Sequence, residues 1–339
     1  MERIFKGRAG RIAAYLTLGF ILTAVSLPAY TRDAVFTGED YDIKLSYNDT
    51  AFPGDAVFVR MRFLQANKRS KVTKEQLSST TATLELYSGD KMLDKSSFYI
   101  LGDGTNKNTL NMLTGSPLSS WWKDDGRYSL KVSYNLYGTT PMEFTLPFGI
   151  KNKEFVSETI PLDESNTSIK TDTSPRRMAQ IERLNGILGT VNAKSVYQTS
   201  PFAPPTAATR RTSFFADRRV YTYTNGKSST SLHYGIDYGV PTGSPVTSCA
   251  AGKVVLAEDR ISTGLSVVIE HLPGLYSLYY HMSEMKVKEG ESVKAGDLIG
   301  LSGATGLATG PHLHWEMRLN MSAVSPDFFT GDFTFESNN

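Results

Sequence analysis

The chain has 339 residues, of which 40% are hydrophobic and 21% are charged, a composition typical of globular proteins with room for two domains. The formal net charge of +2 leaves no basic excess to neutralise phosphates, which excludes nucleic-acid binding as the main function. The single cysteine, Cys249, excludes an internal disulfide. Its place in the small and apolar run SPVTSCAAGKVV predicts a buried, unreactive thiol.

Residues 1–31 have the pattern of an export segment. A basic stretch, MERIFKGRAGR, precedes the uncharged apolar run IAAYLTLGFILTAVSLPAY. This order of charge and hydrophobicity predicts a signal peptide. The run is also close to the roughly 20 residues that cross a bilayer, so a retained membrane anchor is the alternative. In both cases we expect the rest of the chain to be exported to the periplasm or cell envelope.

Residues 36–150 alternate between apolar and polar positions with a period of two. In AVFVRMRF, for example, Val57 and Val59 share one face while Phe58 and Arg60 share the other. Turn signals such as FPGD, SGD and DDG separate several such runs. Half-buried antiparallel strands show this pattern. The region is therefore predicted to be an immunoglobulin-like β-sandwich.

Two adjacent tryptophans, Trp121 and Trp122 in SSWWKDD, occur in this first region. Strand alternation would bury one of them, because neighbouring side chains of a strand point to opposite faces. We interpret the pair as a core or domain contact, and a sugar-binding platform is the alternative.

The composition changes after residue 150. Residues 151–206 are polar and irregular and are predicted to be a linker with one short helix, which has Ser174 as its N-cap and Pro175 at its first position. Residues 207–330 are rich in glycine and in β-branched and aromatic runs, which predicts a second compact β-domain. The whole chain is thus predicted to be all-β.

All five histidines lie in the second β-domain. His233 and Asp237 are four residues apart, and an extended strand places both on one face. The same parity places His312 and His314 together, with Leu313, Trp315 and Met317 on the opposite, core-facing side. The remaining two histidines are His271 and His281.

Two histidines and a carboxylate are a standard three-ligand set for catalytic zinc with an open fourth position. A set of this kind also binds ferrous iron, whereas calcium and magnesium prefer oxygen ligands. Further histidines beside such a metal would serve as acid–base or charge-stabilising groups.

The motifs HYGID, YYH and GPHLHWEMR resemble the signature of the lysostaphin- or LytM-type zinc metalloendopeptidases. The resemblance runs from about Ser213 to Pro326 and includes SFFADRR, in which Ala216 replaces the usual glycine, and the passage VKEGESVKAGDLIGLSGATG. It implies a LytM-like antiparallel β-sheet fold for the second domain.

The resemblance also implies roles for particular residues. His233, Asp237 and His314 correspond to the zinc ligands. His312 corresponds to a general base and His281 to a group that steadies developing negative charge, and the sequence leaves open whether these two roles are exchanged.

Two further polar residues of the domain have no catalytic counterpart in the family pattern. His271 is predicted to be structural. Glu316 shares parity with His314, so it is either a hydrogen-bonding partner of that ligand or a residue with a surface or hairpin-pairing role.

The predicted function is zinc-dependent hydrolysis of peptide bonds in peptidoglycan, in cross-links or in stem peptides. The alternative is a catalytically silent domain that binds peptidoglycan or activates other wall hydrolases. Expected partners are the peptidoglycan peptide and a cell-envelope protein for the first domain. The sequence leaves open which bond is cut, whether the linker inhibits the site, and the oligomeric state.

Overall fold

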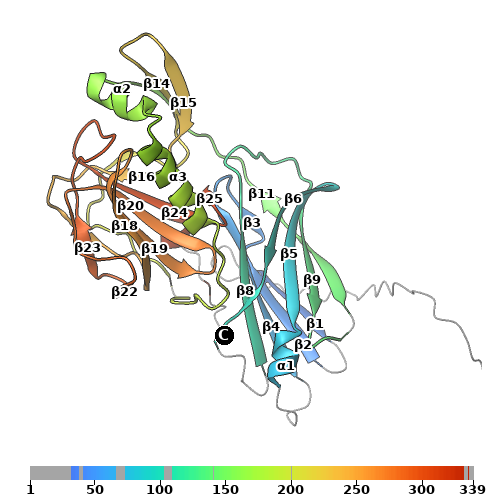
Figure 1. Cartoon of the computed structure of the whole chain (residues 1–339). Helices are drawn as coiled ribbons and strands as arrows, with labels where there is room; N and C mark the ends of the chain where they lie inside the picture. Colours follow the sequence, from blue (N-terminus) through green and yellow to red (C-terminus); the bar gives the residue numbers. More distant parts are fainter. Residues whose placement is uncertain are drawn as a thin grey trace, which may run out of the picture.

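A computed structural model describes residues 32–37, 41–65, 73–102, 109–139, 141–199, 201–331 and 335. Most of these residues lie in β-sheets and only four helices occur among them, which confirms the all-β class. Figure 1 shows two β-structured units side by side: an N-terminal unit, residues 32–150, and a C-terminal unit, residues 211–331. The predicted signal peptide or anchor lies outside the described residues, and no helix within them is long and apolar enough to cross a membrane.

The N-terminal unit contains two antiparallel sheets with the strand orders β1-β2-β4-β8-β7 and β10-β9-β5-β6. The first sheet comprises β1 (Arg32–Thr37), β2 (Tyr41–Tyr47), β4 (Ala56–Gln65), β8 (Thr109–Pro117) and β7 (Tyr99–Ile100). The second comprises β10 (Met142–Pro147), β9 (Tyr128–Asn135), β5 (Thr81–Ser88) and β6 (Lys91–Ser97). The short strands β3 (Thr50–Ala51) and β11 (Gly149–Ile150) pair in parallel, and the helix α1 (Lys74–Ser78) begins at a Thr73 capping box.

One apolar core joins the two N-terminal sheets. The alternating residues predicted to share a face do so: Val57 and Val59 of β4 pack in the same cluster as Leu84 of β5 and Leu130 of β9, and all four side chains are inaccessible to solvent. Burial of these apolar side chains between the sheets is the main contribution to the stability of such a pair of sheets.

Residues 151–210 contain more structure than the single predicted helix. The strand β12 (Ser157–Pro161) and the helix α2 (Glu164–Thr171) precede α3 (Pro175–Leu188). The predicted start of α3 is confirmed, because the Ser174 side chain accepts a hydrogen bond from the Arg177 N–H and proline occupies the first turn. β12 pairs in parallel with β14 (Arg218–Thr222), which also pairs with β15 (Ser228–Leu232).

The C-terminal unit is built on a large sheet with the order β13-β16-β24-β20-β19-β18-β22, to which β25 is added beside β24. Its strands are β13 (Arg211–Ser213), β16 (Gly235–Tyr238), β18 (Gly252–Arg260), β19 (Gly264–Leu272), β20 (Leu275–Met282), β22 (Ser292–Val293), β24 (Leu313–Leu319) and β25 (Ser322–Val324). A small second sheet contains β17 (Pro245–Thr247), β23 (Leu298–Leu301) and β21 (Glu284–Met285), and α4 (Pro326–Thr330) follows β25.

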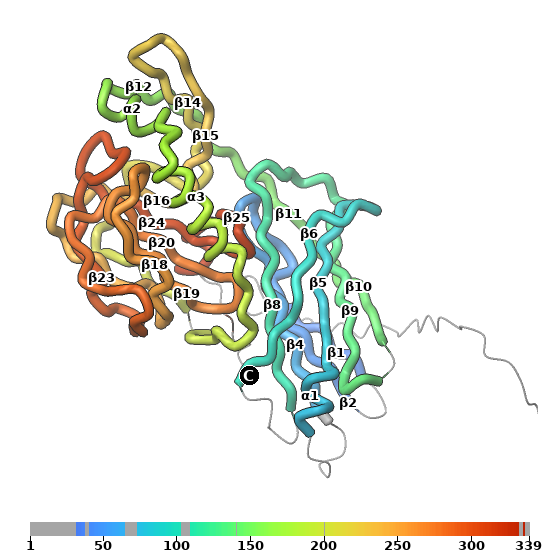
Figure 2. Tube along the Cα trace, viewed as in Figure 1, coloured from blue at the N-terminus to red at the C-terminus, as the bar shows by residue number. Residues whose placement is uncertain are grey.

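The helix α3 lies against one face of this large sheet, as the ribbon and the tube both show (Figures 1 and 2). Leu188 is buried there against Leu278 and Tyr280 of β20. The ion pair between Arg183 of α3 and Glu258 of β18, 2.8 Å long, ties the helix to the same face. Because Tyr280 is directly opposite His314 in the strand pairing, α3 covers the neighbouring part of the face that carries His314.

The two units share a core. Phe58 of β4 is only 3% exposed and packs edge-on against Phe329 of α4, with ring centroids 6.1 Å apart. The Ser325 N–H also donates to the Gly54 carbonyl, at 2.7 Å. The five-stranded sheet therefore packs one face against the other N-terminal sheet and part of its second face, around Phe58, against the C-terminal unit.

Candidate metal centre

Three adjacent strands assemble the predicted histidine site. β24 lies between β16 and β20, and in this register Asp237 and Tyr280 are both directly opposite His314. His233 lies two residues before β16, and its side chain points into the same cluster. As predicted, Leu313 and Trp315 point the other way and are inaccessible in the core.

The side chains of His233, Asp237 and His314 meet at one point. The Asp237 Oδ1 lies 3.0 Å from His233 Nε2 and 2.7 Å from His314 Nδ1, and the two ring nitrogens are 2.9 Å apart. All three residues are buried. The three candidate ligand atoms lie within 4.8 Å of one another, which is the convergence that a single metal ion requires.

The outer nitrogen of each of these two imidazoles is held by an acceptor. His233 donates from Nδ1 to the Phe214 carbonyl at 2.8 Å, and His314 donates from Nε2 to the Glu316 carboxylate at 3.0 Å. When the outer nitrogen keeps its proton, the inner nitrogen is the one that can give up a proton and offer its lone pair to a metal. Both rings are therefore set as metal ligands, His233 through Nε2 and His314 through Nδ1.

The segment Phe214–Asp217 wraps around His233. The Ala216 N–H donates to the His233 carbonyl at 2.7 Å, and the His233 N–H donates to the Asp217 carbonyl at 2.9 Å. Ala216 has a φ of +64°, in the left-handed region that glycine adopts without strain. The tight wrap thus gives a physical reason for the glycine that is usual at this position.

Asp237 uses its second oxygen to bind an arginine. Its Oδ2 lies 3.2 Å from Nη2 of Arg219, and Arg219 in turn forms a 2.8 Å ion pair with Glu158 of β12. Burial alone would raise the pKa of Asp237, but its contacts with His314 and His233 hold that pKa well below the usual range. The carboxylate is therefore ionised, as a metal ligand must be.

A second charged chain continues from His314 along β24. Glu316 contacts His314 and also forms a 2.7 Å ion pair with Arg318. Arg318 and His314 outweigh the effect of burial and lower the pKa of Glu316 to about 2. Burial likewise opposes a charge on His314, yet Asp237 and Glu316 raise its pKa to about 9. Glu316 is thus a hydrogen-bonding partner of His314 and not a surface residue, and this ring lies in a field that attracts a cation.

His281 and His312 flank the three converging side chains. Their ring centroids are 4.7 Å apart, His281 lies 6.0 Å from the His314 ring, and His312 Nε2 lies 3.8 Å from Asp237 Oδ1. His281 donates from Nδ1 to the Thr305 carbonyl at 2.7 Å, and His312 does the same to the Gly310 carbonyl at 2.8 Å. The Nε2 atom of each neutral ring is therefore a proton acceptor.

His281 occupies an unusual backbone conformation, with a φ of +61° at the end of β20. A non-glycine residue is uncommon in this region, and such strain is concentrated at functional sites. Burial, together with neighbouring His312 and His314, lowers the pKa of His281 to about 3. Its ring is neutral at physiological pH.

His271 has a structural role, as predicted. It is inaccessible to solvent and contacts the Ala251 carbonyl at 2.8 Å and the Ser277 hydroxyl at 2.6 Å. Cys249 lies beside it, fully buried, and burial raises the pKa of this thiol to about 11. The prediction of a buried thiol is confirmed.

The donor set fits a borderline divalent metal. Two imidazole nitrogens and one carboxylate oxygen converge, each ligand is held by a hydrogen-bonded partner, and His281 and His312 lie at the side of the cluster. A cation that requires an all-oxygen shell would find only one such ligand among His233, Asp237 and His314.

Sequence reasoning did not identify three residues of this site. Arg219 holds Asp237, Arg318 holds Glu316, and Tyr280 stacks on His314 with ring centroids 5.3 Å apart and planes inclined by 4°. The doublet Arg218–Arg219 was visible within SFFADRR, but only the strand pairing shows which arginine meets the ligand. The pairing of β20 with β24 is likewise what places Tyr280 on His314.

Comparison with protein families identifies the part of the chain that carries this cluster. Residues 231–326 match the model of peptidase family M23. They form an M23 peptidase domain. All of the converging ligands and both flanking histidines lie within this M23 domain.

Curated relatives match mainly through the M23 domain. A DD-carboxypeptidase/endopeptidase of Neisseria meningitidis serogroup B is 43% identical over 95 residues, which are 28% of this chain and 22% of that protein. The peptidoglycan DD-endopeptidase ShyA of Vibrio cholerae serotype O1 is 30% identical over 168 residues, 50% of this chain and 38% of ShyA. The chain thus spans well under half of the length of these relatives.

The fold has a counterpart among solved structures. A Pseudomonas aeruginosa structure assigned by its description to peptidase M23 superposes with a TM-score of 0.50 at 21% identity. The match covers 84% of this chain and 96% of that one, so it includes elements beyond the M23 domain. At this level of identity the likeness concerns the fold alone.

Proposed function

We propose that the chain is a zinc-dependent endopeptidase that hydrolyses peptide bonds in peptidoglycan. The observation that carries the proposal is the convergence of His233, Asp237 and His314 beside two further histidines whose Nε2 atoms are proton acceptors. Metal-assisted peptide hydrolysis needs a Lewis acid and a base within reach of one water molecule. A catalytically silent binding domain is not favoured, because the ligand set is complete.

His233, Asp237 and His314 would hold the zinc. A zinc ion there would supply a Lewis acid that polarises the scissile carbonyl and acidifies the attacking water. Arg219 orients Asp237 through its second oxygen, and Glu316 keeps the proton of His314 on its outer nitrogen. These contacts fix the ligands before any substrate arrives.

His312 takes the proton from the attacking water in this proposal. Its Nε2 is an acceptor, and the side chain is 16% exposed, so the ring can afterwards exchange the proton with solvent or with the leaving amine. This role is the one that the resemblance implies.

We assign His281 a role different from the one that the resemblance implies. Stabilising an oxyanion needs a donor, but the bond from Nδ1 to Thr305 leaves Nε2 of the neutral ring as an acceptor. The lowered pKa of about 3 also opposes a second proton. His281 therefore accepts a hydrogen bond from the attacking water and orients it before attack.

The proposed substrate and location come from the relatives and the sequence. Both relatives described above carry the name endopeptidase, and one carries the name peptidoglycan DD-endopeptidase. D,D-cross-links are accordingly the first bonds to test. We also propose export by the segment 1–31 and an immunoglobulin-like sandwich that positions the M23 domain or docks a cell-envelope protein.

Digestion of purified sacculi tests the proposal. The full chain should release soluble muropeptides, identified by mass spectrometry, and a chelator should stop the release until zinc is restored. Release that continues in the chelator would contradict metal dependence. No release under any condition would instead favour the silent binding domain.

A further inference from the structure

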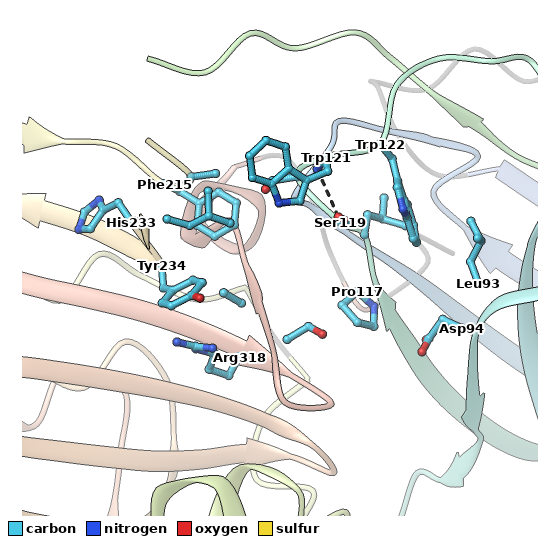
Figure 3. Close-up of a pocket in the computed structure, with 16 residues that line it drawn as sticks. Leu93, Asp94, Pro117, Ser119, Trp121, Trp122, Phe215, His233, Tyr234 and Arg318 are labelled. Carbon is cyan, nitrogen blue, oxygen red and sulfur yellow. Dashed lines mark hydrogen bonds between the residues drawn. The ribbon is translucent and has the colours of Figure 1, made fainter. Parts of the chain in front are cut away.

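The N-terminal and C-terminal units enclose a cleft of about 360 Å³ beside the metal centre. Its walls come from both units, as Figure 3 shows: Trp121 and Trp122 lie on the N-terminal side, and Tyr234, Arg318 and His233 lie on the C-terminal side. His233 is among the residues that line the cleft, and its Nε2 belongs to the metal centre, so the two sites are neighbours.

Aromatic rings provide the accessible surface of the cleft. Trp121 is 64% exposed and Tyr234 is 42% exposed, which are large fractions for aromatic side chains. Trp122 is half-buried against Tyr128, with ring centroids 6.2 Å apart. The adjacent tryptophans therefore have different roles: Trp122 packs against the N-terminal core, and Trp121 presents its indole to the cleft. Both lie between β8 and β9 and not in a strand, so the strand alternation assumed from the sequence does not apply to them.

The exposed indole is held in place. The Arg218 guanidinium lies 3.8 Å from the centroid of the Trp121 ring, and the same arginine donates to the Ser120 carbonyl at 2.7 Å. On the other wall, the Arg318 guanidinium lies 4.5 Å from the centroid of the Tyr234 ring. Both rings are thus preorganised by cation–π contacts, which lowers the entropy that a ligand must overcome.

Two charged side chains line the cleft, and of these Arg318 is paired with a carboxylate while Asp94 has a hydroxyl partner and keeps its negative charge. Arg318 is neutralised by Glu316 at 2.7 Å, and Asp94 accepts a hydrogen bond from the Ser116 hydroxyl. The remaining groups are aromatic faces and hydroxyls such as that of Ser119. Such a lining suits a neutral ligand that combines apolar C–H faces with many hydroxyl and amide groups, which describes an N-acetylated sugar better than a charged peptide.

We propose that this cleft binds the saccharide strand of peptidoglycan while the attached peptide lies at the metal centre. The proposal rests on the proposed function, because it assigns the saccharide part of the same glycopeptide substrate to the cleft that neighbours the metal centre. Trp121 and Tyr234 would stack on sugar rings, and the interface between the two units would be part of the substrate site.

Binding of a sugar without any peptide tests the cleft directly. Calorimetric titration of the full chain with chitotetraose, a neutral tetramer of N-acetylglucosamine, should show binding. Trp121→Ala and Tyr234→Ala should each weaken it by about three- to tenfold. Tyr197→Ala is the matched control, because Tyr197 is a similarly exposed tyrosine, at 39%, outside the cleft. It should bind as the wild type does.

The binding result decides the subsite independently of hydrolysis. Absence of binding by the wild type, or equal weakening by all three variants, would overturn the proposal even if sacculi are digested. Binding that a free stem peptide displaces, in a wild type that binds that peptide more tightly than the sugar, would also overturn it, because the cleft would then be a peptide site.

A comparison of two substrates links the cleft to turnover. The wild type should cleave a cross-linked peptide that carries its disaccharides with a higher kcat/KM than the same peptide without sugars. Trp121→Ala should lower that ratio and Tyr197→Ala should not. If neither substrate is cut, the proposed function fails while the chitotetraose titration still decides the subsite. A wild-type ratio of one would overturn the saccharide role.

Discussion

Two strands of this molecule, β4 in the N-terminal unit and β24 in the C-terminal unit, show the same alternation of side chains between two faces. One face of each strand enters a core, but the second faces have different roles. On β4, Val57 and Val59 enter a sandwich core, and Phe58 on the other face packs against the C-terminal unit. On β24, Trp315 enters the core, and His314 on the other face meets Asp237. Alternation therefore assigns residues to faces, and the elements packed over the second face decide what that face does.

The second faces also differ in how their residues are stabilised. Phe58 needs only apolar contact, and Phe328, Phe329 and Phe335 of the C-terminal unit supply it. His314 is as deeply buried but polar, so each of its nitrogens requires a partner. A face built from such partners tolerates substitution poorly, since removing one group leaves another buried and unsatisfied.

The largest effect is expected at His314. His314→Ala removes one of three ligands, and we expect both bound zinc and hydrolysis of sacculi to be lost. Metal analysis of the purified full chain and muropeptide release are the two measurements. A variant that keeps one equivalent of zinc would show that His314 is not a ligand.

A substitution at His312, two residues before His314, separates metal binding from catalysis. His312→Ala should keep zinc and lower kcat by about 10²- to 10⁴-fold, because a positioned base is lost while the three ligands stay. Zinc content measured beside kcat serves as the internal control for His314→Ala. Loss of zinc in this variant would place His312 among the ligands instead.

On β4, the corresponding change should affect stability. Phe58→Ala should lower the free energy of unfolding by about 3–5 kcal/mol, because a buried aromatic ring between the two units is removed. Urea unfolding of the full chain measures it. Val35→Ala, at a position 63% exposed on β1 of the same sheet, is the control and should change stability by less than about 0.5 kcal/mol. Equal effects of both variants would mean that the second face of the sheet contributes little.

The smallest effect is expected at Arg219, which contacts the ligand Asp237 and does not itself belong to the ligand set. Arg219→Ala should weaken zinc binding by about 10- to 100-fold, since Asp237 loses the partner of its second oxygen. Glu158→Gln should act in the same direction and less strongly. Competition with a chelator measures affinity, and Arg183→Ala, which removes an ion-paired arginine of α3, should leave affinity unchanged. If Arg219→Ala left the affinity for zinc unchanged, the contact of Arg219 with Asp237 would be an ion pair with a structural role only.

Residue patterns alone predicted much of this site. Alternation separated His312 and His314 from Leu313 and Trp315, and the spacing of His233 and Asp237 indicated a shared face. The structure brings these residues together as expected. Such predictions succeed because they depend on the period of one strand, a local property.

What the sequence did not reveal depends on contacts between distant segments. Glu158 reaches Arg219 only because β12 pairs in parallel with β14, and no local pattern specifies that pairing. The φ of +61° at His281 is set by the surrounding chain and not by residue type. The exposure of Trp121 follows from how the two units meet, and strand alternation does not apply to a residue between β8 and β9.

The parallel strand β12 also determines where the chain can be cut to isolate the M23 domain. A fragment that starts at residue 207 would contain every ligand and both flanking histidines, yet β14 would lose a partner strand and Arg219 would lose Glu158. A fragment that starts before Ser157 would keep both, together with α2 and α3. The smallest stable fragment with an intact metal centre is therefore expected to be about fifty residues longer than the fragment that starts at residue 207.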